Sequence, residues 1–362
     1  MSNFEENLLI KDRNTLLYYI FGGILIFSFA NLAYGNKTNQ CIYEDPFDVA
    51  SGGANLTRAT QTGILFANPA QLPYGGKFFR WLGLRTTFIV GKDSVDFARE
   101  MIAADKKSST ESESGANEGG EFVDRLLKTP VHFGSSTAVS FLTNNGGLSA
   151  FYRVEPDIQA KKYSETGTPA VVLQGEAYGG AIASIAGRTP WRNLSLGLSA
   201  KYLYAAEPYV SIQIADQQAI ESLSSGGGEA ETLKEIQTGT GFDAGLLYFV
   251  QSSSVDFRLA LKADDVGNTK FSGDGNPKEF KQTFHGGLGL TFHNQVDALH
   301  LSFDYRDVLG AYEEKNFKKL YMGAKLMIRT YVGVGVGYYQ GAPSYGIELD
   351  LFIMRISGTL YT

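Results

Sequence analysis

Residues 255–263 read VDFRLALKA, with an apolar residue at every second position. Successive side chains of a β-strand point to opposite faces, so this stretch predicts a strand with one apolar face and one largely polar face. The apolar face would carry Val255, Phe257, Leu259, Leu261 and Ala263, and the other face Asp256, Arg258, Ala260 and Lys262. The pattern predicts a strand that separates an apolar environment from a polar one.

The same alternation recurs along the chain and predicts an all-β fold. It is clear in 148–158, 194–204, 299–306, 320–329 and 330–339, and weaker in 78–91, 131–142, 171–186, 239–250, 283–292 and 345–361. A soluble sandwich alternates as well, with its apolar face turned inward. Here, however, most segments are longer than an ordinary strand of about five or six residues, and short connections alternate with long ones. Both features favour a transmembrane antiparallel β-barrel. The segments number about thirteen if residues 345–362 form a hairpin and about twelve if they form one long strand. Because bacterial barrels have even numbers, about fourteen strands are expected, with one strand missed, and about twelve is the alternative.

The composition fits this fold and excludes one class of partner. The 362 residues include 42 Gly, 24 Phe and 20 Tyr, which is typical of many strands joined by tight turns and bordered by aromatic girdles. The formal net charge is −6, and no cluster of Lys and Arg is present, so we expect no nucleic-acid partner. Cys41 is the single cysteine, which rules out a disulfide within the chain.

The amino terminus predicts export. Residues 20–33, IFGGILIFSFANLA, form an apolar run that is shorter than the roughly 20 residues of a spanning helix. The run ends in Ala33-Tyr34-Gly35, a small-x-small pattern, so residues 1–35 are expected to be a signal peptide cleaved near Gly35. The leader carries Glu5, Glu6 and Asp12, which leaves an uncleaved anchor as the alternative. We expect the mature protein in the cell outer membrane.

Residues 36–77 are predicted to form a plug, and residues 78–362 the barrel. Within the first region, 45–76 reads DPFDVASGGANLTRATQTGILFANPAQLPYGG and alternates poorly. It has too few apolar residues to fold alone, yet it carries Phe47, Val49, Leu56, Ile64, Leu65, Phe66, Leu72 and Tyr74. We therefore expect this stretch to lie inside the lumen of the barrel.

Four motifs in this order resemble a known family. They are 66–72, with Asn68-Pro69-Ala70 followed by Leu72; 265–271, DVGNTKF; 284–292, FHGGLGLTF; and 319–346, with its GAK, GVGVGYY and YG pieces. Together the sequence resembles the FadL-like long-chain fatty acid transporter superfamily, which includes TraF-like and PorV-like barrels. The resemblance implies an outer-membrane barrel closed by an amino-terminal hatch and, in the transporter branch, hydrophobic ligands that bind inside and leave sideways. The chain departs from that pattern in being shorter and in ending on Tyr361-Thr362 rather than on a terminal aromatic residue.

The candidate site residues fall in two groups. The plug group is Phe66, Asn68, Pro69, Ala70 and Leu72. The lumen-facing group is Arg153, Glu155, Asp256, Arg258, Asp304, Arg306, Lys325, Gly333, Gly335 and Gly337. We expect the charges to pair with one another and with the plug, and the glycines to form a smooth wall that plug backbone can approach. Proline biases Asn68 toward extended geometry, and the resulting bend either gates a ligand cavity or only leads from the plug to the first strand.

No catalytic or metal-binding constellation stands out. The sequence contains no G-x-S-x-G elbow, and its four histidines, His132, His285, His293 and His300, do not have metal-ligand spacing. Gly333, Gly335 and Gly337 resemble a nucleotide loop only superficially, because no helix follows them. We expect neither an enzyme nor a bound cofactor or metal.

Two functions remain from the sequence. The first is uptake or passage of hydrophobic small molecules, such as long-chain fatty acids, by a barrel surrounded by outer-membrane lipid. The second is a structural or secretion/conjugation-accessory barrel that binds a protein partner through its long outer loops. The acidic, Ser- and Gly-rich segments 105–120 and 221–231 motivate the second function.

Overall fold

The computed structural model describes residues 42–74, 82–90, 94, 99, 127, 131–162, 169–191, 193–206, 209–213, 236–273, 279–294, 297–329, 331–350 and 355–361. The expected signal peptide, its cleavage site and the acidic segments 105–120 and 221–231 lie outside these residues.

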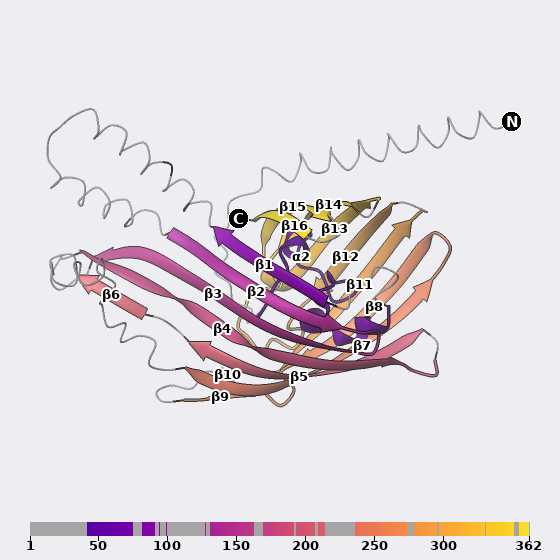
Figure 1. Ribbon diagram of the computed structural model, residues 1–362, viewed down its shortest axis with the longest axis horizontal. Coiled ribbons are helices and arrows are strands. Elements are labelled where there is room, and N and C mark those ends of the chain that lie inside the picture. Colours follow the sequence, from indigo (N-terminus) through magenta and orange to yellow (C-terminus); the bar gives the residue numbers. More distant parts are fainter. Residues whose placement is uncertain are drawn as a thin grey trace.

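Antiparallel strands pair one after another to build the wall of a barrel (Figure 1). In order along the wall they are β1 (Leu82–Val90), β2 (Val131–Leu142), β3 (Gly146–Lys162), β4 (Pro169–Arg188), β5 (Leu194–Ala206), β7 (Gln237–Gln251), β8 (Val255–Asp264), β11 (Thr283–His293), β12 (Ala298–Tyr305), β13 (Leu320–Ile328), β14 (Val332–Tyr339), β15 (Ala342–Asp350) and β16 (Arg355–Tyr361). Short turns join β2 to β3, β4 to β5, β7 to β8, β11 to β12 and β13 to β14 at one end, which we call the turn end. We call the opposite end the loop end.

The number of strands agrees with the sequence reading in which residues 345–362 form a hairpin. Within the described residues the wall has thirteen strands, because the segment 345–361 contributes to two strands, β15 and β16, which pair as a hairpin. Three further short strands, β6 (Tyr209–Gln213), β9 (Thr269–Ser272) and β10 (Glu279–Phe280), lie outside the alternating segments of the sequence. Since every step along the wall is antiparallel, the odd number makes β1 and β16 run in the same direction.

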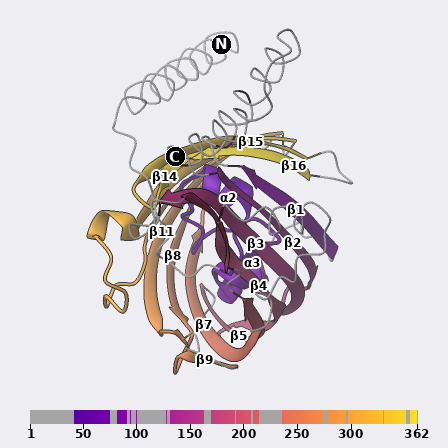
Figure 2. The same cartoon turned by 90° about the vertical axis from the view of Figure 1, so that its left-hand side faces the viewer.

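The first and last strands come together through a side chain. Arg85 of β1 donates from Nη2 to Ser357 Oγ of β16 at 2.7 Å, and its Nη1 lies 2.9 Å from Glu348 Oε2 of β15. Figure 2 shows that the strands surround the plug. The Arg85 side chain therefore bridges the two edges of the sheet, between which no backbone pairing is found among the described residues.

The outside of the barrel is apolar and the inside polar, which is the reverse of a soluble protein. In β8, Val255, Phe257, Leu259 and Leu261 are 36%, 37%, 37% and 51% exposed, whereas the intervening Asp256 is 6% exposed. Trp191 and Tyr331 are highly exposed near the turn end, where an aromatic girdle is expected. This exterior matches a membrane-embedded barrel. Among the described residues, no helix has the length and apolar character that a membrane crossing requires.

The plug lies inside the wall and contains three short helices (Figure 2). These are α2 (Pro46–Ala50), α3 (Ile64–Ala67) and the 3-10 helix η1 (Pro69–Tyr74). Asp45 caps α2 by accepting from the Phe47 N–H at 3.0 Å, and Pro46 follows it in the first turn. A further 3-10 helix, η3 (Asn316–Lys319), belongs to the loop before β13. The plug pattern predicted no helix, because these pieces are too short to show a 3.6-residue period.

Candidate functional site

The end of α2 packs its backbone against glycines of the wall. A side chain on Gly337 of β14 would overlap Gly52, with the Gly52 Cα only 2.5 Å from the added Cβ. Gly335 faces the Ala50–Ser51 backbone, and a Cβ on Gly333 would lie 2.6 Å from the Phe47 ring. Gly52 itself has φ +80° and lies against the Met322 carbonyl of β13. These contacts place the three expected glycines under the plug and leave no space for larger residues.

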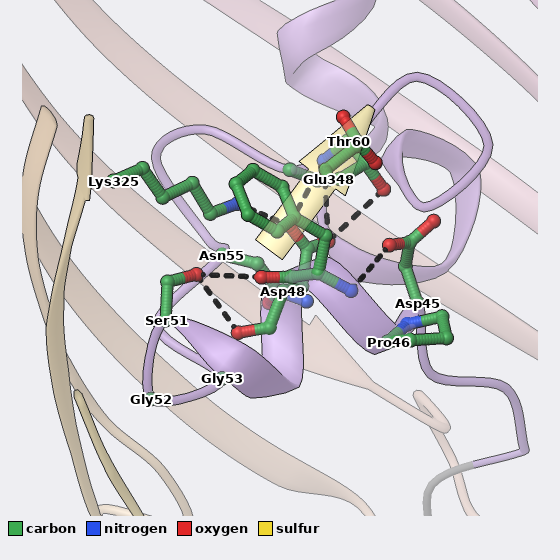
Figure 3. Close-up of polar contacts among 12 residues, drawn as sticks. Asp45, Pro46, Asp48, Ser51, Gly52, Gly53, Asn55, Thr60, Lys325 and Glu348 are labelled. Atoms are coloured by element: carbon green, nitrogen blue, oxygen red, sulfur yellow. Dashed lines mark hydrogen bonds and ion pairs between the residues drawn. The ribbon is translucent and has the colours of Figure 1, made fainter. Parts of the chain in front are cut away.

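Polar contacts around Asp48 tie α2 to the rest of the plug and to β13 (Figure 3). The Asp48 carboxylate forms a buried ion pair with Lys325 Nζ. It also accepts from the Thr60 N–H at 3.1 Å. Just after the helix, the Gly52 N–H donates to Ser344 Oγ of β15 at 3.1 Å.

Arg85 joins the plug to the closing strands. Its Nε lies 3.0 Å from the Asp45 carboxylate, while the same guanidinium contacts Glu348 and Ser357. Thr359 of β16 donates to the Pro46 carbonyl at 2.6 Å. Sequence reasoning missed Arg85 and Asp45, because Arg85 belongs to a weakly alternating strand and its partners are more than 260 residues away or in the plug.

Asn68 anchors the opposite side of the plug to β7. It is 0% exposed and extended at φ −164° and ψ 108°. Its Nδ2 donates to the carbonyls of Leu56 and Leu246 at 3.2 and 3.3 Å, and its Oδ1 accepts from the Ala70 N–H at 3.0 Å. Gly245 provides the space against which this side chain packs.

The residues after Asn68 continue this contact onto β5. Ser195 donates to the Ala70 carbonyl at 2.5 Å, and a Cβ on Gly197 would lie 2.7 Å from the Pro69 carbonyl carbon. Leu72 is 0% exposed and packs with Ile64, Leu65, Leu142 and Ile182. The Asn68-Pro69-Ala70 bend therefore lies between plug and wall.

Asn68→Ala tests this anchor. The substitution leaves the carbonyls of Leu56 and Leu246 and the Ala70 N–H without their partner, so we expect a loss of about 1–3 kcal/mol in the free energy of unfolding. Urea unfolding of the purified barrel measures it. Asn145→Ala, at an exposed turn where the side chain donates to the Ala186 carbonyl, is the control and should cost clearly less. Equal effects at both positions would contradict an anchoring role.

The middle of the plug binds lumen-facing charges of β8 and β12. Asp304 Oδ2 accepts from the Leu56 N–H at 3.0 Å, and Arg258 Nη1 donates to the Thr57 carbonyl at 3.0 Å. Arg306 Nη2, just after β12, donates to the Gly53 carbonyl at 2.6 Å. The expected charges Asp256, Asp304, Arg258, Arg306 and Lys325 thus lie around the plug.

Arg153 and Glu155 form a separate pair on β3. Arg153 Nε and Nη2 lie 2.9 and 2.8 Å from the two carboxylate oxygens of Glu155. Both residues are buried, at 7% and 9% exposure. Their bidentate pairing satisfies both charges on the lumen wall.

A cavity of about 80 Å³ lies between the plug and the loop-end half of the wall. Its apolar side is formed by Ile42, Phe66, Ala67, Ile182 and Phe280. Phe66 is partly buried, and its ring lies 4.6 Å from the Tyr43 ring and 5.2 Å from the Phe151 ring, centroid to centroid. Phe280 lies 4.9 Å from Phe271 in the same way. Of these residues only Phe66 was a candidate from sequence.

The other side of the cavity is a network of paired charges. Lys201 Nζ lies 2.7 Å from Asp243 and 2.9 Å from Asp265, and Lys262 Nζ lies 2.6 Å from Asp264. Burial raises the pKa of Asp265, and Lys201 offsets part of that increase. Lys262 also donates to the Phe66 carbonyl at 2.5 Å, so the charged side holds the aromatic side in place. In the described part of the chain, no group of three or more His, Cys, Asp or Glu is placed to hold a metal ion.

Asp307 organises the loop that follows β12. Burial by itself would raise its pKa, but Lys319 Nζ at 2.9 Å and the N–H groups of Tyr312 and Ala311 outweigh burial and lower the pKa. An acid whose pKa is lowered on folding adds stability above its unfolded pKa, and this stability is lost as pH falls through the folded pKa.

Asp307→Asn should therefore remove part of the acid sensitivity of the protein. We expect the unfolding midpoint of the unmodified chain to fall more steeply than that of the variant below about pH 4, where the unfolded carboxylate begins to protonate. Unfolding in urea across that pH range measures the difference. Parallel curves for the two proteins would show that Asp307 contributes nothing to the pH dependence.

Comparisons with known proteins give only distant likenesses. No known protein family matches the sequence. No curated protein matches it either. Among solved structures, the chain is similar to the TodX monoaromatic hydrocarbon channel deltaS2 mutant, with 13% identity and a TM-score of 0.37 over 90% of this chain and 84% of the other. It is also similar to CdiB from Acinetobacter baumannii, with 7% identity and a TM-score of 0.29 over 65% of this chain and 51% of the other. These scores are too low to carry the fold or the function, which rest on the contacts and exposures of this chain.

Proposed function

We propose that this chain is an outer-membrane barrel for the passage of hydrophobic small molecules, with long-chain fatty acids as the substrate class. The supporting observation is the cavity between plug and wall, which has an aromatic and aliphatic side and a charged side. Such a cavity suits an amphiphile whose apolar body packs on Phe66, Ile182 and Phe280 and whose polar head lies at the charged side.

The cavity is smaller than the proposed ligand, so we interpret this arrangement of the plug as a closed state. Sites for drug-sized ligands measure roughly 300–1,000 Å³, so a volume of about 80 Å³ holds only part of a fatty acid. Phe66 is the side chain whose movement would enlarge it, because it is partly buried and belongs to α3 rather than to the wall. We therefore expect ligand binding to displace α3.

Ile182→Trp tests the cavity. Ile182 is 0% exposed and faces the cavity, so an indole there fills the space and should lower uptake of labelled long-chain fatty acid by about tenfold or more. Ile185→Trp is the matched control, because Ile185 is on the same strand but 67% exposed on the outside. Uptake should then equal that of the unmodified chain.

The proposal also predicts a bound ligand. Mass spectrometry of the gently purified barrel should detect a lipid-like molecule that the Ile182→Trp variant lacks. Unchanged uptake in Ile182→Trp, together with an empty extract, would instead favour a structural or secretion-accessory barrel. In that role the many contacts that fix the plug would serve only to fill the lumen.

A further inference from the structure

A row of polar side chains crosses three strands of the lumen wall near the turn end, away from the cavity. Thr291 of β11 pairs with Asp256 of β8 on one side and with His300 of β12 on the other. Thr291 Oγ1 lies 2.9 Å from His300 Nδ1, and His293 Nε2 lies 3.2 Å from Asp256 Oδ1. Arg258 follows Asp256 on the same face of β8, two residues toward the loop end.

Arg58 of the plug lies over this row. Arg58 follows Thr57, whose carbonyl accepts from Arg258 Nη1 at 3.0 Å, so the plug brings Arg58 beside the row. Its guanidinium interacts electrostatically with Asp256, Arg258 and His300. Burial lowers the pKa of Arg58 to about 10, and Asp256 offsets part of that effect. The plug thus brings a second guanidinium beside that of Arg258 in a poorly hydrated place.

The charges of this group do not balance. Arg58 and Arg258 are cationic, and Asp256 is the carboxylate that acts on both of them. Asp256 is already bonded to His293, and Lys325, the next side chain along the row, is paired with Asp48. Like charges that are buried together are unfavourable unless a further anion joins them.

Two hydrogen-bond donors of the group are also unused. Arg258 is 6% exposed, and its Nε has no hydrogen-bond partner among the described residues; the same holds for Thr57 Oγ1. The remainder of the Arg258 guanidinium is engaged, since Nη1 binds the Thr57 carbonyl and its Cζ lies 4.5 Å from the Phe249 ring centroid. Buried donors in native proteins are nearly always paired, so a missing acceptor is indicated.

The group can be reached from the turn end. Arg58 is half-buried rather than fully enclosed, and the His293 side chain is 26% exposed. Arg58 and His293 are therefore the members of the group that solvent reaches.

We propose that Arg58, Arg258, Thr57 and His300 form a binding site for a carboxylate. A carboxylate supplies the single negative charge that the group lacks, and its two oxygens match the paired N–H groups of a guanidinium. A phosphate would bring more charge than the group lacks. The binding of a carboxylate here is independent of the loop-end cavity, although use of the site by a departing fatty acid rests on the proposed function.

Isothermal titration of the purified full-length barrel in a neutral detergent tests the site. Octanoate should bind the unmodified chain, and Arg58→Gln and Arg258→Gln should each weaken it by about tenfold or more. Arg188→Gln is the matched control: Arg188 is exposed near the turn end and donates to the Pro73 carbonyl, so octanoate affinity should not change. Octanol, which has no charge, should bind all four proteins alike.

Three further results would support or overturn the carboxylate site. Equal octanoate affinity in Arg58→Gln and the unmodified chain overturns the site, and because Arg58 is in the plug this variant does not alter the barrel wall. If inorganic phosphate competes with octanoate as strongly as acetate competes with it, the choice of a carboxylate as the ligand is overturned. Acetate is too small to need the loop-end cavity. If acetate binds the unmodified chain and does not bind Arg58→Gln, the site is supported even if no fatty acid passes through the barrel.

Discussion

Gly52→Ala is expected to release the end of α2 from the wall and to open the lumen to small ions. Gly52 has φ +80°, and an added methyl group would overlap the Met322 carbonyl and lie 2.9 Å from the Tyr338 backbone nitrogen. The atoms in the way are strand backbone, which cannot move without breaking the β13–β14 ladder. We expect a cost of about 1–3 kcal/mol from overpacking and a further 1–2 kcal/mol from the left-handed backbone. The expected result is a higher conductance in planar bilayers and faster proteolysis of the plug.

Gly267→Ala separates the cost of the left-handed backbone from the cost of overpacking. Gly267 has φ +82°, but nothing lies within 4 Å of an added Cβ. This variant should carry the backbone cost alone and keep the conductance of the unmodified chain. A Gly52→Ala barrel with unchanged conductance and an equally protected plug would show that the glycine contacts do not hold α2.

The wall of this protein could be predicted from sequence because its signal is local. Two-residue alternation in segments such as 255–263 determines both the strand and which side chains face the lumen, and the structure places Asp256 and Arg258 inside and Phe257 outside. For the last segment, 345–361, the sequence left a hairpin and one long strand open, since its alternation is weak, and the structure shows the hairpin. Its division into β15 and β16 makes the strand number odd.

The site could be predicted only in part, because its partners are distant in sequence. The glycines of β14 were expected to face the plug, but nothing in the sequence shows that Gly337 meets Gly52 or that Arg85 meets Glu348. The cavity depends on how the plug folds in the lumen, and its three helical pieces have no periodic pattern of their own. Tyr43, Phe280 and Lys201 consequently received no role before their surroundings were known.

Arg85→Met is expected to be the most destabilising single change at the closure of the barrel. Arg85 is 6% exposed and lies between two carboxylates, Asp45 of the plug and Glu348 of β15, whose side chains are 0% and 4% exposed. Its removal leaves both acids buried without their cation, and breaking a buried ion pair from one side costs about 3–5 kcal/mol. Ser357 of β16 also loses the hydrogen bond that brings the last strand beside the first.

Urea unfolding of the purified barrel measures this loss, and two further variants assign it. Asp45→Asn leaves the Arg85–Glu348 pair in place, so its cost should be clearly smaller than that of Arg85→Met. Arg188→Met removes an exposed guanidinium near the turn end together with its hydrogen bond to the Pro73 carbonyl, and should cost no more than about 1.5 kcal/mol. If Arg85→Met is no more harmful than Arg188→Met, the closure does not depend on this side chain. If the Arg85→Met loss is large and Asp45→Asn matches it, the contact of the plug with Arg85, rather than the strand-to-strand contact with Glu348, is what keeps the first and last strands together.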